Sequence, residues 1–111
     1  MLFNPYSIVL VPFPFTDSSA VKRRPALVIC SKAHQKETHC TTLMMITTAK
    51  NSTWPSDYLI QDLKSCGLTT ESLIRQKIFT IDSRLIIKKL GELDEKEHKN
   101  FTKILTLHLG L

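Results

Sequence analysis

The stretch SIVLVPFPFTD (residues 7–17), followed by KRRPALVIC (residues 22–30), decides how this chain folds. Residues 8–11 are four β-forming side chains without polar alternation, so they predict a strand from residue 7 to 11 that is covered on both faces. Pro12 and Pro14 lack an amide donor, so we expect them to end or edge this strand. After a polar loop and three consecutive cations, residues 26–30 predict a second buried strand, with Pro25 at its first position.

Length and charge set limits on the class of protein. A chain of 111 residues is one domain by size, so we predict a single domain over residues 1–111. The net charge of +5 favours a polyanionic partner such as nucleic acid or an acidic peptide. Three cysteines (Cys30, Cys40 and Cys66) without a signal peptide indicate reduced thiols and a cytoplasmic protein. The apolar run over residues 8–15 is too short to span a bilayer, so no membrane partner is predicted.

The rest of the chain predicts further strands and loops. Residues 32–38 read as a polar connection, 40–47 as a third strand, 49–57 as a long loop and 58–63 as a short strand. Residues 72–78 and 79–87 are β-rich. Their candidate core residues are Ile78, Phe79, Ile81, Leu85, Ile86 and Ile87.

The last segment predicts a helix from about residue 94 to 109. Asp94 is a good N-cap with Glu97 three residues on, in a capping-box pattern, and Gly110 suits the C-cap. Its apolar face would carry Phe101, Ile104, Leu105 and His108. The predicted fold class is therefore mainly β with a C-terminal helix, in a small, partly closed antiparallel barrel. A barrel this small fills its interior with side chains, which places any binding site on its loops.

Motifs for metals and nucleotides are missing from the sequence. Cys30, His34, His39 and Cys40 lie close together, but no C-x-x-C or H-x-x-x-H pair occurs, so we predict no metal and no other cofactor. There is also no G-x-x-x-x-G-K, G-x-G-x-x-G or G-x-S-x-G motif. Phosphate-loop, dinucleotide and serine-esterase chemistry therefore have no support.

The basic and aromatic residues remain as candidates. Each cation can be read as a solvated rim charge, but Arg24 precedes Pro25, which favours an extended backbone and aims a guanidinium from the rim. Such a group grips a phosphate with two parallel donors. Thr47 and Thr48 end the third strand, either for their β-propensity or for function. Trp54 and Tyr58 could stack on unpaired bases, or Trp54 could only pin its loop to the barrel.

In this order, the motifs resemble the MazF/PemK family of toxin ribonucleases from type II toxin–antitoxin systems. The resemblance rests on IVLVPFPFTD (residues 8–17), RPALVI (24–29) and ITT (46–48), with weaker matches at 72–75, 77–82 and 90–93. It implies an SH3-like small β-barrel of the MazF/PemK/CcdB type, usually a homodimer. It also implies metal-independent cleavage of single-stranded RNA and a cognate antitoxin partner.

The same resemblance assigns site residues. Arg24 matches the catalytic arginine, and Thr47 matches the threonine that helps to hold the reacting phosphate. The residues expected to contact RNA are Phe15, Thr16, Asp17, Lys22, Arg23, Thr48, Trp54, Arg75 and Lys77. One departure is Tyr6-Ser7, where members usually carry Gly-Asp, so we expect the N-terminal loop to differ.

Two other functions stay open at this point. One is a toxin of the same fold that poisons a protein target, as gyrase-inhibiting relatives do, although those lack the Arg–Pro and Thr pair. The other is a non-catalytic SH3-like module that binds RNA or peptide. The general base of the cleavage reaction also stays unassigned, because neither matching block contains a histidine and arginine is a poor base.

Overall fold

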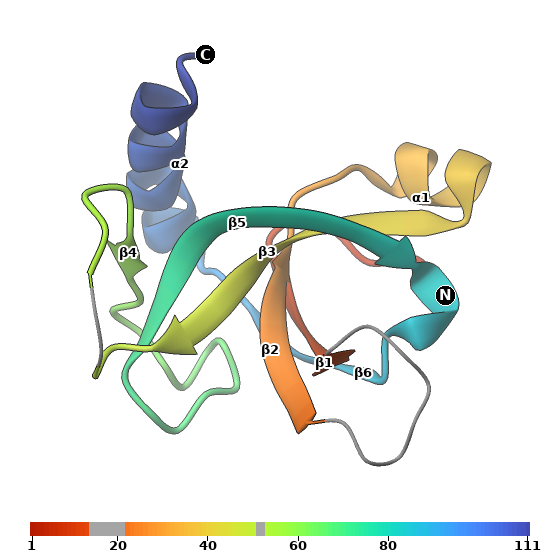
Figure 1. Cartoon of the computed structure of the whole chain (residues 1–111), viewed down its shortest axis with the longest axis horizontal. Helices are drawn as coiled ribbons and strands as arrows, with labels where there is room; N and C mark the ends of the chain where they lie inside the picture. The colour runs from red at the N-terminus through yellow and green to blue at the C-terminus, as the bar shows by residue number, and fades with distance from the viewer. Residues whose placement is uncertain (14–21, 51–52) are drawn as a thin grey trace.

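The structure, a computed structural model, describes residues 1–13, 22–50 and 53–111 (Figure 1). Its strands are β1 (Ser7–Phe13), β2 (Lys22–Val28), β3 (Cys40–Thr48), β4 (Tyr58–Leu59), β5 (Ser72–Asp82) and β6 (Lys88–Glu92). Its helices are α1 (Lys32–Thr38), a 3-10 turn (Ser83–Leu85) and α2 (Glu95–Leu109). The strands form one antiparallel sheet in the order β4-β5-β3-β2-β1-β6. Figure 1 shows β5 arching across β3, with α2 standing to one side. The prediction of a mainly β fold with a C-terminal helix is confirmed.

Apolar side chains pack on both faces of the sheet. Ile8, Leu27 and Met44 belong to the cluster that contains Phe101 of α2. Val9 and Val11 belong to a second cluster, and alternation along β1 directs them to the opposite face from Ile8. The unbroken apolar run in β1 is therefore buried on both sides, as its sequence predicts.

The prolines of the opening stretch lie inside strands, which corrects the predicted strand ends. Pro12 pairs with Arg23 within β1, and Pro25 pairs with Leu10 within β2. On the other side of β1, pairing with β6 runs only from Ser7 to Leu10. Likewise, β2 pairs with β3 only from Ala26 to Val28. Each proline therefore sits where its strand has one hydrogen-bonded neighbour, so its missing amide breaks no ladder. Pro14 lies outside the described residues.

Other predictions about the chain were also wrong. The short strand predicted over residues 58–63 is only the two-residue β4. Residues 32–38 form α1, which begins after Ser31, whose side chain accepts from the amide of His34, and ends at His39 with φ +59°. The two β-rich segments form the single strand β5 and a 3-10 turn, and β6 follows them. Ile78 and Ile87 are 46% and 41% exposed, so they are not core residues, whereas Ile81 is buried.

Helix α2 confirms its predicted boundaries but uses Glu97 differently. The Asp94 side chain accepts from the amide of Glu97, and Gly110 ends the helix in the left-handed conformation. The buried carboxylate of Glu97 accepts hydrogen bonds from Tyr58 Oη (2.9 Å) and from the amides of Gln61 (2.6 Å) and Asp62 (3.1 Å). Glu97 therefore ties α2 to the connection between β4 and β5.

That connection, residues 60–71, also reaches the far edge of the sheet. The amide of Glu92 in β6 donates to the carbonyl oxygen of Ser65 at 3.2 Å. A Cβ atom at Gly91 would lie 2.4 Å from the same carbonyl oxygen, so only glycine allows this approach. The connection thus bridges the two edge strands and closes the open side of the barrel.

Candidate active site

The β2–β3 ladder places Arg24 and Thr47 opposite each other. The ladder pairs Val28 with Leu43 and Ala26 with Met45, and it stops there. Continuing the same antiparallel register two residues further brings Arg24 opposite Thr47, with both side chains on one face of the sheet. The two residues that the motifs single out therefore meet where their strands are no longer hydrogen-bonded to each other.

A pocket of about 190 Å³ opens at this point. Arg24, Thr47 and Thr48 line it from the strands, and Leu68, Thr69 and Thr70 line it from the closing connection. The lining therefore combines one guanidinium with several hydroxyl groups. Such donors suit a phosphate, because charged and neutral hydrogen bonds converge on its oxygens.

Arg24 has donor capacity that the described part of the protein does not use. Its guanidinium lies 5.6 Å from the centre of the Phe13 ring, an arrangement that restrains the side chain. Its Nε atom is buried and has no hydrogen-bond partner among the described residues. A buried donor without an acceptor is costly, so an acceptor brought by an anionic ligand would relieve that cost.

A second basic cluster is built around Trp54. Arg75 donates to Asp57 through Nε (3.1 Å) and Nη2 (2.8 Å), and the amide of Trp54 donates to the same carboxylate at 2.7 Å. The Arg75 guanidinium lies 4.6 Å from the centre of the Trp54 ring, and Lys77 Nζ lies 5.6 Å from it. Trp54, Arg75 and Lys77, which the sequence places in separate segments, are thus brought together.

Asp57 is held in its charged form by these neighbours. Burial acts to raise the pKa of its carboxyl group, but the hydrogen bonds from Arg75 and from the Trp54 amide outweigh burial. The pKa of Asp57 therefore lies below its ordinary value of 3.8. The ion pair consequently persists at neutral pH.

The remaining predicted site residues fall in different places. Lys22 and Arg23 are exposed on β2 beside Arg24. Tyr58 is buried in the core and donates to Glu97, so it is no platform for a base. Phe15, Thr16 and Asp17 lie outside the described residues.

The N-terminal departure from the family pattern has a clear structural counterpart. Tyr6 adopts φ +69°, a conformation that favours glycine, the residue usual at this position in the family that the motifs resemble. Its ring lies 3.8 Å, centre to centre, from that of His98 in α2. Ser7, which stands in place of the usual aspartate, is fully buried, and its hydroxyl has no partner among the described residues. The backbone path of a glycine is therefore kept here by a packed aromatic ring.

Sequence reasoning missed two groups of residues. Asp57, which holds Arg75, carries no local signal. The capping-box pattern identified Glu97 only as part of the helix start, because its role in holding the closing connection depends on contacts distant in sequence. Thr69 and Thr70 follow the turn at Gly67, whose φ of +71° marks a change of direction, and this turn was the available clue.

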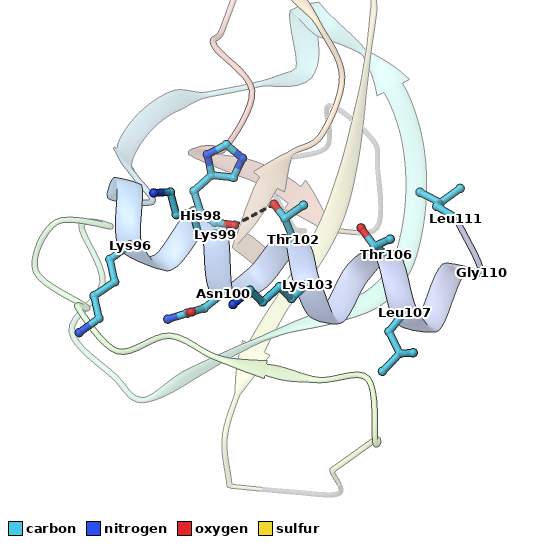
Figure 2. Close-up of a pocket in the computed structure, with 10 residues that line it drawn as sticks. All are labelled: Lys96, His98, Lys99, Asn100, Thr102, Lys103, Thr106, Leu107, Gly110 and Leu111. Carbon is cyan, nitrogen blue, oxygen red and sulfur yellow. Dashed lines mark hydrogen bonds between the residues drawn. The ribbon is translucent and has the colours of Figure 1, made fainter.

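Another hollow lies along the outer face of α2 (Figure 2). Figure 2 shows Lys96, Lys99 and Lys103 along this face, followed by Leu107 and Leu111 at the C-terminal end. It contains none of the predicted site residues. Among the described residues, no group of three or more His, Cys, Asp or Glu side chains could hold a metal ion. Within the same residues, no helix has the length and apolar content needed to cross a membrane.

Comparison with known families and structures agrees with the fold. The profile of the family described as "PemK-like, MazF-like toxin of type II toxin-antitoxin system" matches residues 4–109. No match is found among curated protein sequences.

Three solved structures illustrate the likeness. MazF (Form-I) from Deinococcus radiodurans is 17% identical with a TM-score of 0.75, and the alignment covers 100% of this chain and 99% of that one. Mycobacterium tuberculosis toxin MazF-mt6 is 16% identical with a TM-score of 0.75, over 95% of this chain and 97% of that one. An endoribonuclease in complex with its cognate antitoxin, from Mycobacterial species, is 16% identical with a TM-score of 0.74, over 98% and 96%. At these identities the structures establish the fold.

Proposed function

This chain belongs to the PemK-like, MazF-like toxin family of type II toxin–antitoxin systems, and from that premise we propose that it is a metal-independent, sequence-selective endoribonuclease of single-stranded RNA that inhibits growth. The observation that carries the proposal is the pocket in which Arg24 and Thr47 meet, with the buried Arg24 Nε unpartnered among the described residues. A guanidinium and hydroxyl groups around one small opening fit a phosphate of the RNA backbone.

The reaction uses a nucleophile that RNA itself carries. The 2′-oxygen attacks the adjacent phosphorus and the bond to the 5′-oxygen breaks, which leaves a 2′,3′-cyclic phosphate and a 5′-hydroxyl end. Negative charge builds up on the phosphoryl oxygens during this step. Arg24 donates to those oxygens, and Thr47 adds a hydroxyl donor to the same group. Fixed donors aimed at developing charge typically contribute about 10²–10³-fold in rate.

Two protons must also move. The 2′-hydroxyl loses one, and the departing 5′-oxygen gains one. Among the described residues, the pocket lining contains neither a carboxylate nor an imidazole. We therefore assign Arg24 and Thr47 to charge stabilisation and to orientation of the phosphate, with water taking the proton of the 2′-hydroxyl and water giving one to the departing 5′-oxygen.

A cognate antitoxin and a second copy of the chain are the partners that we propose in the cytoplasm. One structural neighbour is an endoribonuclease solved with its cognate antitoxin. The net charge of +5 would attract an antitoxin segment that carries acidic residues. Mixing the toxin with its antitoxin before adding RNA should suppress cleavage.

The test is cleavage of a long labelled RNA in EDTA, with mapping of the cut sites and of the new ends. We expect cuts with cyclic-phosphate ends, near-complete loss of cleavage in Arg24→Ala, and normal cleavage in the control Arg84→Ala. Arg84 is a suitable control because its exposed side chain, within the part of the chain that the structure describes, pairs with Asp82 and lies outside the pocket. Full activity of Arg24→Ala, or cleavage at a 2′-deoxyribose, would rule out this chemistry.

Outcomes without cleavage point to the other two functions. Binding of RNA without cuts would identify a non-catalytic module. A protein that neither binds nor cuts RNA, yet stops growth, would identify a toxin with a protein target.

A further inference from the structure

We propose that Trp54 is a preformed stacking platform for an unpaired base next to the scissile phosphate, and that Asp57 and Arg75 are positioning residues for it. This inference rests on the proposed function, because it names how the same site engages its RNA. It also changes the role expected of Arg75, from a contact with phosphate to a support for the indole.

The exposure of Trp54, Asp57 and Arg75 is the opposite of what is expected if Trp54 only anchors its loop to the barrel. An indole that pins a loop is buried, and its charged neighbours remain in water. Here the Arg75 and Asp57 side chains are only 12% and 4% exposed, whereas Trp54 is 38% exposed. Burying an ion pair costs desolvation free energy. That cost is incurred beneath an aromatic ring that still faces solvent.

Asp57 and Arg75 hold the Trp54 indole through two separate contacts. The Asp57 carboxylate accepts from the Trp54 amide, which sets the backbone, and also accepts two hydrogen bonds from Arg75. The Arg75 guanidinium in turn lies 4.6 Å from the centre of the indole, which sets the ring. A ring held in place before binding loses little conformational freedom when a base stacks on it.

The sheet register brings this cluster close to the pocket. Arg75 pairs with Met45, and Leu73 pairs with Thr47. Thr47 and Arg75 are therefore diagonal neighbours on one face, which in antiparallel sheets are about 7–8 Å apart. Gln76 and Lys77 lie in a bulge, because the partners of Met45 and Met44 are Arg75 and Ile78. Lys77 thus adds an exposed cation 5.6 Å from the centre of the ring, where its charge would attract a neighbouring phosphate.

Fluorescence tests the platform independently of cleavage. Trp54 is the only tryptophan of the chain, so fluorescence excited at wavelengths that tyrosine does not absorb reports on this ring alone. The probe is a pool of short, single-stranded RNA of random sequence in which every 2′-hydroxyl is methylated, so that it cannot react. The control is a base-free sugar–phosphate chain of equal length and charge. We expect saturable quenching by the RNA and much weaker quenching by the base-free chain, whereas equal quenching by both would overturn the proposal.

Kinetics of Trp54 variants supply the second measurement. Stacking of one base is worth about 1–3 kcal/mol, so Trp54→Ala should raise KM for single-stranded RNA by roughly 5- to 150-fold. Its kcat should stay close to that of the parent protein, and Trp54→Phe, which keeps an aromatic face, should recover most of the loss. An unchanged KM in Trp54→Ala, or a fall in kcat alone, would overturn the proposal.

Asp57→Asn separates positioning from stacking. It keeps the size of the side chain and weakens the grip on Arg75, so we expect a smaller rise in KM and a shifted emission maximum in the free protein. Circular dichroism shows whether Asp57→Asn is folded. If it is unfolded, the kinetics of the Trp54 variants still test the stacking platform. Cleavage without base-dependent quenching would sink this inference alone. Base-dependent quenching without cleavage would support it and sink the proposed function.

Discussion

Removing the Glu97 carboxylate should destabilise the protein far more than its place in the first turn of a helix suggests. In Glu97→Ala, the hydroxyl of Tyr58 and the amides of Gln61 and Asp62 lose their acceptor at once. The matched control is Glu95→Ala, which removes an exposed carboxylate from the same turn.

The magnitude follows from the three contacts. A hydrogen bond to a charged group contributes about 1.5–3 kcal/mol, and an unsatisfied buried donor costs about 1–3 kcal/mol. Tyr58 is only 5% exposed, so water cannot replace its acceptor, whereas Gln61 and Asp62 lie at the surface and their amides can be hydrated in part. We therefore expect a loss of about 3–5 kcal/mol in the free energy of unfolding, which lowers Tm by roughly 12–20 °C in a domain of this size.

Urea denaturation followed by circular dichroism measures this difference. Tyr58→Phe alone and with Glu97→Ala completes a double-mutant cycle, in which the double variant should lose less than the two single losses together. If Glu97→Ala and Glu95→Ala differ by less than about 0.5 kcal/mol, which is the usual range for surface substitutions, the tie between α2 and the closing connection has no energetic importance.

A substitution, a pH titration and a chemical modification test three further features. Thr47→Val keeps a β-branched side chain but removes the hydroxyl, so kcat for RNA cleavage should fall by roughly 10- to 150-fold without a change in Tm; an unchanged kcat would exclude a role in the reaction. Hydrogen bonds hold the pKa of Asp57 below 3.8, so their stabilisation is present above that pH and is lost as pH falls through the lower value in the folded protein. Trp54 emission should therefore change only below pH 3.8, and Asp57→Asn should lack this transition. Burial raises the pKa of the Cys66 thiol to about 11, so iodoacetamide should modify the partly exposed Cys30 and Cys40 first, as mass spectrometry would show. Equal rates at all three thiols would contradict that environment for Cys66.

Local signals explain which elements were predictable. The strands β1 and β3 follow from apolar runs, and α2 follows from Asp94, its apolar spacing and Gly110. Helix α1 has no apolar face, because its one buried side chain is Gln35, which bonds to the backbone of Phe3. The only local sequence signal for α1 is Ser31, which caps its N-terminus.

Contacts between distant residues explain the errors. The strand β6 is short and mostly exposed, and it depends on pairing with β1 and on the close approach of Gly91 to Ser65. Ile78 follows the bulge in β5, which changes the direction of the side chains that come after it. Neither effect has a local pattern in the sequence.

In the candidate site, too, local motifs identified some residues, whereas contacts between distant residues determine the rest. The Arg24-Pro25 and Thr47 motifs pointed to residues that the structure brings into one pocket, and their catalytic roles remain predictions. The sequence also named Trp54 and Arg75 but gave no reason to join them, because their arrangement depends on Asp57.

The early end of the β2–β3 ladder has a thermodynamic consequence for the folded protein. Two strands that part before their ends leave backbone and side-chain donors without the partners that a complete sheet would supply. An anion that fills this gap binds the folded chain and finds no such site in the unfolded one, so it must raise the melting temperature, and the rise continues with the logarithm of its concentration above the dissociation constant. The toxin should therefore be at its least stable when empty, and a simple thermal-shift screen of phosphates and oligonucleotides would rank its ligands without any catalysis.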